Sequence, residues 1–296
     1  MLEKKGKMIM RGKSILLGIA AVIMVACAPA PKGDASALES ADTADAGIIG
    51  GKEVAANESP AQTTVILYDT IAKGVCTGSL LGNNIVLTAA HCLGFDPSKI
   101  LIVFATNLQK TNMEMARPIV GAIVHSWWKT NRQKGKDTGD IALVKYQGRT
   151  PPGYKAATIL PNVSPLKNNA QIVLAGYGFS DGVKKKGSGV LRQTVTTIVN
   201  NQFSSTEILI EQRQGRGACH GDSGGPAYIV ANGVYYLWGI SSRGNQEVKD
   251  QCNAFSVYTN MLVYMKWLQD TARSLVAKNQ FDFLQEDRSF GRGERF

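Results

Sequence analysis

Three separated segments of this sequence contain the residue types that a nucleophilic serine needs around it. They are TAAHC at 88–92, DIAL at 140–143 and GDSGGP at 221–226. A serine hydroxyl attacks a carbonyl carbon only when a neighbouring base removes its proton, and a third group must hold that base in one tautomer. Ser223, His91 and Asp140 could fill these roles in turn, and with three histidines in the chain few other bases are available.

Glycines surround Ser223 on both sides. Gly221, Gly224 and Gly225 let the backbone turn sharply, so that the amides of Gly221 and Ser223 can point at one spot. Two main-chain donors there would stabilise the negative charge that develops on an attacked carbonyl oxygen. The pattern therefore predicts an oxyanion hole formed by Gly221 and Ser223.

Each segment also has a structural interpretation when it is taken alone. A Gly-Asp-Ser-Gly tetrapeptide can be a plain turn, a histidine after a strand can be a surface or core residue, and an aspartate before a strand can be a cap. Asp137 is a rival to Asp140, although it lies outside the DIAL run. The chemical interpretation depends on all three segments occurring together.

Short runs rich in Val, Ile and Leu recur after Ile48, separated by Gly, Asn, Asp and Pro. The runs are 63–68, 78–88, 100–105, 119–125, 141–146, 170–175, 190–199, 207–211, 226–230 and 234–240. Many short strands without intervening helical patterns predict an all-β sandwich or barrel. A Pro-rich stretch at 149–165 suggests two β-domains in tandem, and apolar residues at helical spacing predict one helix over 261–275.

The N-terminus has the pattern of a targeting segment. A basic stretch precedes the apolar run 15–26, which falls within the ~7–15 residues of a signal-peptide core and short of the ~20 needed to span a bilayer. The sequence Met-Val-Ala before Cys27 resembles a bacterial lipobox, which predicts lipidation of Cys27. Ordinary signal cleavage, with Cys27 incidental, is the alternative.

Charge and cysteine content fit an exported protein without nucleic-acid partners. Of the formal net charge of +10, five basic residues against one acidic residue in 1–26 contribute +4. The remainder is spread thinly, apart from a lysine run at 184–186 that we interpret as a solvated loop. Of the five cysteines, four remain when Cys27 is set aside, an even number available for disulfides in an oxidising compartment.

From Ile48 to about Lys278, the sequence resembles the trypsin/chymotrypsin family of serine proteases. Besides the three segments above, the resemblance is carried by IIGG at 48–51, AGYG at 175–178 and VYT at 257–259. It implies an all-β fold of two tandem Greek-key six-stranded β-barrels with a C-terminal α-helix. The predicted domains are a signal peptide (1–26), a linker or pro-segment (27–47), the N-terminal barrel (48–160), the C-terminal barrel with the helix (161–279) and a tail (280–296).

The resemblance also implies roles for particular residues. His91, Asp140 and Ser223 would form the catalytic triad in the cleft between the barrels. The disulfides would join Cys76 to Cys92 and Cys219 to Cys252. Cleavage before Ile48 would free an ammonium group that pairs with Asp222 and orders the site. Gly47 departs from the family pattern, which typically has Lys or Arg before the cut.

The resemblance assigns a substrate pocket as well. Its residues would be Gly217, Ala218, His220, Ser242, Gly244 and Ser256. Gly217 stands where trypsins carry an aspartate, so a Lys or Arg side chain would be buried there without a partner. Ser256 replaces a wall glycine, which favours small or medium apolar side chains. Arg243 stands where the family usually has Trp, and it could favour an acidic side chain or simply be a solvated residue.

These observations predict a serine endopeptidase that works through an acyl-enzyme intermediate, with non-trypsin specificity and no cofactor or metal. Its partners would be protein or peptide substrates, with membrane attachment only through Cys27, no nucleic acid and a monomeric state. It would be exported, as a bacterial cell-envelope lipoprotein or in secreted form after processing. The alternative is a catalytically silent homologue, a cell-surface binding or adhesion lipoprotein. An esterase of another fold would need a strand-to-helix turn at Ser223, but Gly, Gly and Pro follow it.

Overall fold

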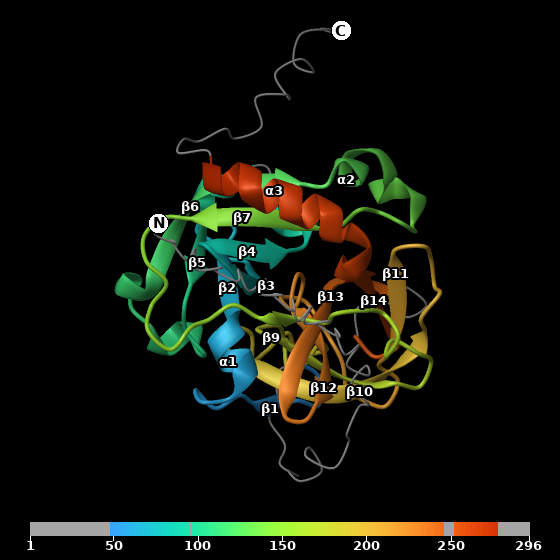
Figure 1. Cartoon of the computed structure of the whole chain (residues 1–296). Coiled ribbons are helices and arrows are strands. Elements are labelled where there is room, and N and C mark those ends of the chain that lie inside the picture. Colours follow the sequence, from blue (N-terminus) through green and yellow to red (C-terminus); the bar gives the residue numbers. More distant parts are fainter. Residues whose placement is uncertain (1–47, 95, 246–251, 278–296) are drawn as a thin grey trace, which may run out of the picture.

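The strands of the chain close into two antiparallel barrels (Figure 1). The computed structural model describes residues 48–94, 96–245 and 252–277. The predicted signal peptide, the linker, Cys27 and the tail lie outside the described residues. The predicted fold class, two six-stranded barrels followed by a C-terminal helix, is confirmed.

The first barrel closes in the order β2-β3-β4-β7-β6-β5. Its strands are β2 (Thr64–Asp69), β3 (Val75–Gly82), β4 (Ile85–Thr88), β5 (Ile100–Val103), β6 (Ala116–Val124) and β7 (Ala142–Tyr146). Because β4 neighbours β7 while β5 closes onto β2, the connections are not simply up-and-down, as Greek-key topology requires. Apolar side chains such as Val65, Leu67, Val86, Ile102 and Val144 fill the interior.

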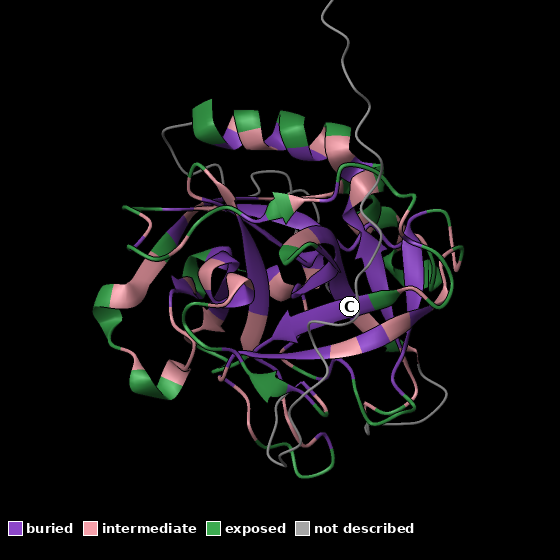
Figure 2. Ribbon diagram, turned by 60° about the horizontal axis from the view of Figure 1, so that its bottom comes forward, coloured by how far each residue is buried: buried purple, intermediate pink, exposed green. Residues whose placement is uncertain are grey.

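The second barrel closes because β10 pairs with both β9 and β11. Its strands are β9 (Gln171–Gly176), β10 (Arg192–Asn200), β11 (Glu207–Glu211), β12 (Pro226–Ala231), β13 (Val234–Asn245) and β14 (Phe255–Asn260). Two short strands form additional pairings outside this ring, β1 (Lys52–Glu53) with β10 and β8 (Thr158–Ile159) with β13. Most strand residues of both barrels are buried, and the strands in Figure 2 are correspondingly mostly purple.

Several local predictions need correction. Residues 48–53, which we expected in the N-terminal barrel, lie against the second one, because β1 pairs with β10 and Ile49 bridges to Gly217. The expected run 78–88 is two strands, since Asn83 and Asn84 turn the chain with φ of 50° and 61°. Two helices, α1 (Ser59–Thr63) and α2 (Ser126–Asn131), are too short to show periodicity in sequence.

Short 3₁₀ helices complete the connections within the described residues. They span Ala90–Leu93, Pro97–Lys99, Leu108–Lys110, Met113–Met115, Arg132–Lys134 and Met261–Tyr264.

A buried tyrosine connects the two barrels. The Tyr177 hydroxyl, from the second half, donates to the carbonyl oxygens of Thr64 (3.2 Å) and Ala105 (2.7 Å) in the first. The barrels therefore meet through specific hydrogen bonds as well as apolar contact.

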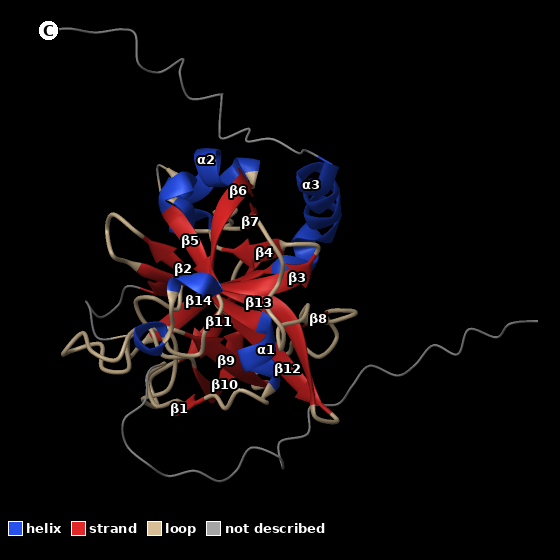
Figure 3. Ribbon diagram, turned by 90° about the vertical axis from the view of Figure 1, so that its left-hand side faces the viewer, coloured by secondary structure: helices blue, strands red, loops and turns tan. Residues whose placement is uncertain are grey.

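The predicted terminal helix is present as α3 (Met265–Ala277), directly after the last 3₁₀ turn. It follows the second barrel in sequence but lies across β7 of the first (Figures 1 and 3). Leu268 and Leu275 are buried, and the Lys145 ammonium of β7 donates to the carbonyl oxygen of Val276 at 3.3 Å. No helix in the described part of the chain combines the length and apolar character needed to span a membrane.

We expect Leu275→Ala to lower the free energy of unfolding by roughly 2–4 kcal/mol, because Leu275 is 4% exposed and its truncation leaves a cavity beneath α3. The neighbouring Val276, which is 44% exposed, provides the matched control, and Val276→Ala should change stability by about 0.5 kcal/mol or less. Urea unfolding of both variants measures the difference. Equal losses would contradict docking of the helix through Leu275.

Candidate active site

Strand pairing brings His91 and Asp140 together. His91 lies in the 3₁₀ helix after β4, Asp140 lies just before β7, and Thr88 of β4 pairs with Ala142 of β7. The Asp140 carboxylate is buried, and its Oδ2 lies 2.8 Å from His91 Nδ1 while its Oδ1 accepts from the His91 backbone N–H at 3.0 Å. The Ser242 hydroxyl donates to the same Oδ2 at 2.6 Å. These bonds hold the imidazole with its Nδ1 edge against the carboxylate.

The pairing changes the proton affinity of both groups. Burial lowers the pKa of the His91 imidazole, but the negative charge of Asp140 and the hydrogen bond to it together outweigh burial, so the pKa is raised. Burial raises the pKa of Asp140, but the charge of His91 and the hydrogen bonds from His91 and Ser242 overcome it, so the pKa is lowered. Asp140 therefore stays ionised and favours a protonated His91.

The loop that carries Ser223 is held from two sides. On one side, Gly224 N–H donates to Ser241 O (2.7 Å) and Ser241 N–H to Gly225 O (2.8 Å), which fixes the loop to β13 beside Ser242. On the other, Ser223 O accepts from Thr77 N–H at 2.8 Å and lies 3.4 Å from the Sγ of Cys92, the residue after His91. The structure thus brings all three predicted residues to one place between the barrels.

The predicted oxyanion donors are free of internal acceptors. Within the described residues, the N–H groups of Gly221 and Ser223 make no hydrogen bond to the protein. Gly221 has φ of +100°, and a Cβ there would lie 2.8 Å from the Cα of Gly178, so only glycine fits. The Thr77 hydroxyl donates to Gly221 O at 2.9 Å and fixes this peptide. Neither of these two N–H groups is therefore committed to an acceptor in the part of the chain that the structure describes.

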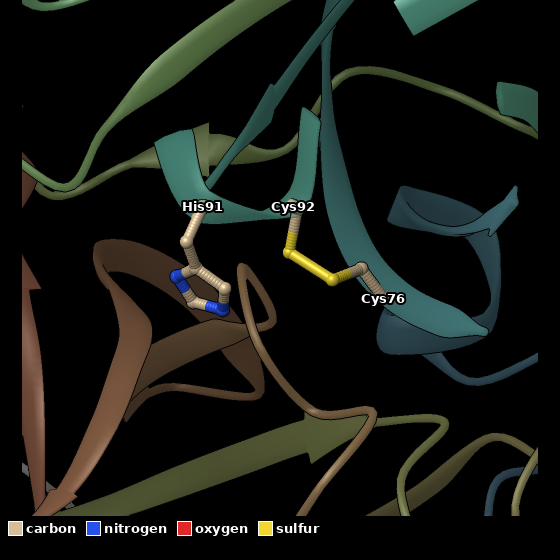
Figure 4. Close-up of side chains that lie close together, drawn as sticks. All are labelled: Cys76, His91 and Cys92. Atoms are coloured by element: carbon tan, nitrogen blue, oxygen red, sulfur yellow. A yellow bond between two sulfur atoms is a disulfide. The ribbon is translucent and has the colours of Figure 1, made fainter. Parts of the chain in front are cut away.

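Both implied disulfides are present, Cys76–Cys92 and Cys219–Cys252. Figure 4 shows the first of them beside His91, where the sulfur atoms and a ring nitrogen lie within 4.8 Å of one another. Such a group could suggest a metal site, but metals bind thiolates, and these sulfur atoms are already bonded to each other. The bridge instead ties the His91 turn to β3.

Asp222, next to the serine, is a second buried carboxylate. It is 1% exposed, and it accepts hydrogen bonds from the backbone N–H groups of Gly178 (2.7 Å) and Cys219 (2.8 Å). Burial raises its pKa to about 7 in spite of these bonds and of the charge of Arg192. Ile48, the predicted new N-terminus, is fully buried, and its φ of 45° is unfavourable for a β-branched residue.

A buried glutamine that the sequence did not single out, Gln212, packs against two of the predicted pocket residues, Gly217 and Ala218. The Gln212 side-chain oxygen accepts from Ala218 N–H at 2.7 Å, and its amide nitrogen donates to Cys252 O at 3.0 Å. A Cβ on Gly217 would overlap this amide, so a pocket aspartate cannot be accommodated there without moving Gln212. Gln212 follows β11 directly and precedes the predicted pocket residues in the sequence. No sequence motif there indicated that its side chain would contact them.

The other predicted pocket residues differ in their surroundings. Ser256 faces Gly244 across the β13–β14 pair, and its hydroxyl is buried with no partner among the described residues. Space beside Gly244 is open. Ser242 uses its hydroxyl on Asp140, as described above, and His220 is exposed, with its ring 6.3 Å from that of Phe179. The Ser256 hydroxyl is thus turned into the protein interior, whereas Gly244 has free space beside it.

The fold also shows the surroundings of three other side chains near the site, two that the sequence had singled out and one that it had not. The solvated interpretation of Arg243 is wrong, because its guanidinium pairs with the buried Glu207. Asp137, the rival to Asp140, instead accepts from the backbone and hydroxyl of Thr206 at 2.9 and 2.8 Å. Trp128 of α2, which the sequence did not suggest, lies with its ring centroid 6.3 Å from that of His91.

The sequence model of the Trypsin family matches residues 48–268. The chain is 25% identical over 249 residues to chymotrypsin-like elastase family member 1 from Homo sapiens, covering 78% of this chain and 94% of that protein. It is 29% identical over 235 residues to chymotrypsin from Phaedon cochleariae, covering 75% of this chain and 81% of that protein. The chain therefore belongs to the trypsin family.

We expect the His91 imidazole to titrate above 6.5 and the Asp140→Asn variant to titrate below it, because without the carboxylate charge only burial acts on the ring. Nuclear magnetic resonance of labelled histidines measures both values. His125, whose pKa burial lowers, serves as an internal reference that the substitution should leave unchanged. Identical titration of His91 in the two proteins would contradict the pairing.

Proposed function

We propose that this protein is a serine endopeptidase that uses Ser223, His91 and Asp140. The observation that carries the proposal is the buried Asp140 carboxylate against His91 Nδ1, with the Ser223 main chain in contact with the next residue, Cys92. A structural turn would not need a histidine held in one tautomer beside two main-chain donors that have no internal acceptor.

In the proposed reaction, Ser223 Oγ attacks the carbonyl carbon of the scissile peptide bond while its proton moves to His91 Nε2. Asp140 stays ionised and stabilises the imidazolium that forms. The N–H groups of Gly221 and Ser223 bind the oxyanion, a contribution of roughly 3–4 kcal/mol per donor in comparable enzymes. His91 then protonates the leaving amine as the C–N bond breaks, and water hydrolyses the acyl-enzyme by the same steps.

For specificity, we propose small or medium uncharged side chains next to the scissile bond. Gln212 fills the place in which a pocket carboxylate would stand, so a substrate Lys or Arg would meet no opposite charge. Ser256 narrows the wall relative to glycine. Arg243 is neutralised by Glu207, which argues against recognition of acidic side chains.

We propose further that the chain is made as a zymogen that is cut before Ile48. The Asp222 carboxylate is buried beside two N–H donors, and burial raises its pKa to about 7. An ammonium group placed beside it would stabilise the ionised form. The left-handed backbone at Ile48 costs about 1–3 kcal/mol, and cleavage would release it. The uncut protein would then be nearly inactive.

Export rests on the sequence pattern together with the disulfides. Two disulfides fit an oxidising compartment. We propose that a bacterial lipoprotein signal directs export and that Cys27 carries lipid. Cleavage before Ile48 would then release the catalytic part from the envelope. A catalytically silent surface homologue is the competing function, and the unusual Gly47 before the cut is the observation in its favour.

The first test is covalent labelling with a fluorophosphonate probe. Protein cut before Ile48 should be labelled at Ser223 and should hydrolyse peptides, and Ser223→Ala should lose about 10⁶-fold in kcat. His91 can act as a base only after its imidazole has lost its proton, and its pKa is raised from 6.5. We therefore expect kcat/KM to rise with pH through a midpoint above 6.5.

A protein that binds peptides but takes up no label, cut or uncut, would be the silent homologue instead. A pH profile that is flat from acid to neutral values would exclude His91 as the base.

The second test follows the pH dependence of stability. An Asp whose folded pKa is about 7 rather than 3.8 binds its proton more tightly when folded, so the free energy of unfolding falls as pH rises between these values. The loss should be a few kcal/mol at most in the uncut chain. Cleavage before Ile48 should remove it, since the ammonium lowers the pKa of Asp222. Urea unfolding of cut and uncut Ser223→Ala protein measures the effect.

The uncut Asp222→Asn protein is the control and should show a flattened pH dependence. Mass spectrometry of active material should find Ile48 at the N-terminus. Full activity with the 46–48 segment intact would refute activation by cleavage.

A further inference from the structure

We propose that Arg243, paired with Glu207, is a positioning residue that keeps Asp140 aligned with the His91 ring. The inference rests on the proposed endopeptidase function and adds two residues of this chain to it. Neither residue touches the reacting atoms, so both would act through the Ser242 hydroxyl and through the loop that leads into Asp140.

The ion pair itself is two-pronged and largely removed from water. Arg243 Nη1 donates to Glu207 Oε1 at 2.9 Å, and Nη2 donates to Oε2 at 2.8 Å. The Glu207 side chain is 1% exposed and that of Arg243 is 28% exposed. Such fork-to-fork geometry fixes the orientation of the guanidinium plane, which a lysine ammonium would not do.

One arm of the guanidinium sets the direction of the Ser242 hydroxyl. Arg243 Nη1 lies 3.3 Å from Ser242 Oγ, and Ser242 Oγ lies 2.6 Å from Asp140 Oδ2. Arginine can only donate and an ionised carboxylate can only accept. The hydroxyl must therefore accept from Arg243 and give its single proton to Asp140, which removes its rotational freedom.

The other arm holds the chain segment just before Asp140. Arg243 Nη2 donates to Gly135 O at 2.6 Å. Glu207 Oε1 accepts from Thr138 twice, from the backbone N–H at 3.3 Å and from the hydroxyl at 3.0 Å. Glu207 lies on β11 and Arg243 on β13 of the second barrel. Through these hydrogen bonds the pair holds residues 135–138, the loop that leads into Asp140.

These contacts converge on the carboxylate that lies 2.8 Å from the His91 ring. The charge of Asp140 and the hydrogen bond to it raise the pKa of His91 against the effect of burial. Buried ion pairs often add little net stability compared with apolar residues of similar size. A pair in which four hydrogen bonds run to Ser242 and to the Asp140 loop is therefore better explained by positioning than by stability alone.

The test compares variants that separate charge pairing from positioning. Arg243→Met leaves Glu207 buried without its partner, whereas the double variant Arg243→Met, Glu207→Gln removes both charges and should fold more stably than the single one. Arg243→Lys is the conservative variant. Arg213→Met is the matched control, because Arg213 makes a similar two-pronged pair with Glu211 at the opposite end of β11.

The readouts are kcat and KM per fluorophosphonate-titrated site, together with the pKa of His91 by nuclear magnetic resonance. Arg243→Met and the double variant should lose on the order of 10- to 100-fold in kcat, with KM within about twofold of wild type. The reason is that the Asp140 carboxylate is no longer held in position against the His91 ring. The pKa of His91 should fall, and the acid limb of kcat should move to lower pH. Arg243→Lys should recover part of kcat, and Arg213→Met should match the wild type.

Wild-type kcat and an unchanged His91 pKa in the double variant would overturn the inference, and so would a double variant that regains kcat together with stability. If Arg243→Met does not fold, the double variant decides. A wild-type protein that is neither labelled nor active overturns the proposed function instead. The His91 titration then still tests positioning, because it needs no turnover.

Discussion

The buried charge of Asp140 is the constraint on which the rest of this structure depends. A carboxylate out of water must have its oxygens satisfied, or it would lose its charge or destabilise the fold by several kcal/mol. Here the donors come from both halves of the chain, from the backbone and ring of His91 in the first and from Ser242 in the second. The two barrels must therefore meet in one relative position, and the same contacts that satisfy the charge align the imidazole.

Two further buried carboxylates show how differently the same fold satisfies such charges. Glu207 is met by the guanidinium of Arg243 and by Thr138, so its pair joins β11 and β13 to the loop before Asp140. Asp222 has two backbone N–H donors, and its pKa stays raised by burial. Glu207 thus has a guanidinium partner, whereas Asp222 is bonded to backbone N–H groups and is the residue that we propose receives the new ammonium group. That contrast separates a residue suited to positioning from one suited to a switch.

The surroundings of the predicted pocket residues depend on a side chain that packs against them from elsewhere in the chain. Gln212 reaches from the end of β11 to Ala218 and Cys252, and its amide occupies the space next to Gly217. The absence of a carboxylate at 217 is visible in the sequence, but the reason that none fits is visible only in the folded chain. Arg243 is similar, since a charge near a pocket attracts substrate only when no internal partner neutralises it.

The all-β class, the terminal helix and the three segments that meet at the site could all be predicted from local patterns in the chain. Strand and helix periodicity are local properties, and the residues around His91, Asp140 and Ser223 form compact local patterns. Only the folded chain shows that residues 48–53 join the second barrel, that Asp137 bonds to Thr206, and that Arg243 pairs with Glu207. Each of these depends on which groups must share a buried space to satisfy charge and hydrogen bonds, and sequence spacing carries no record of such long-range pairing.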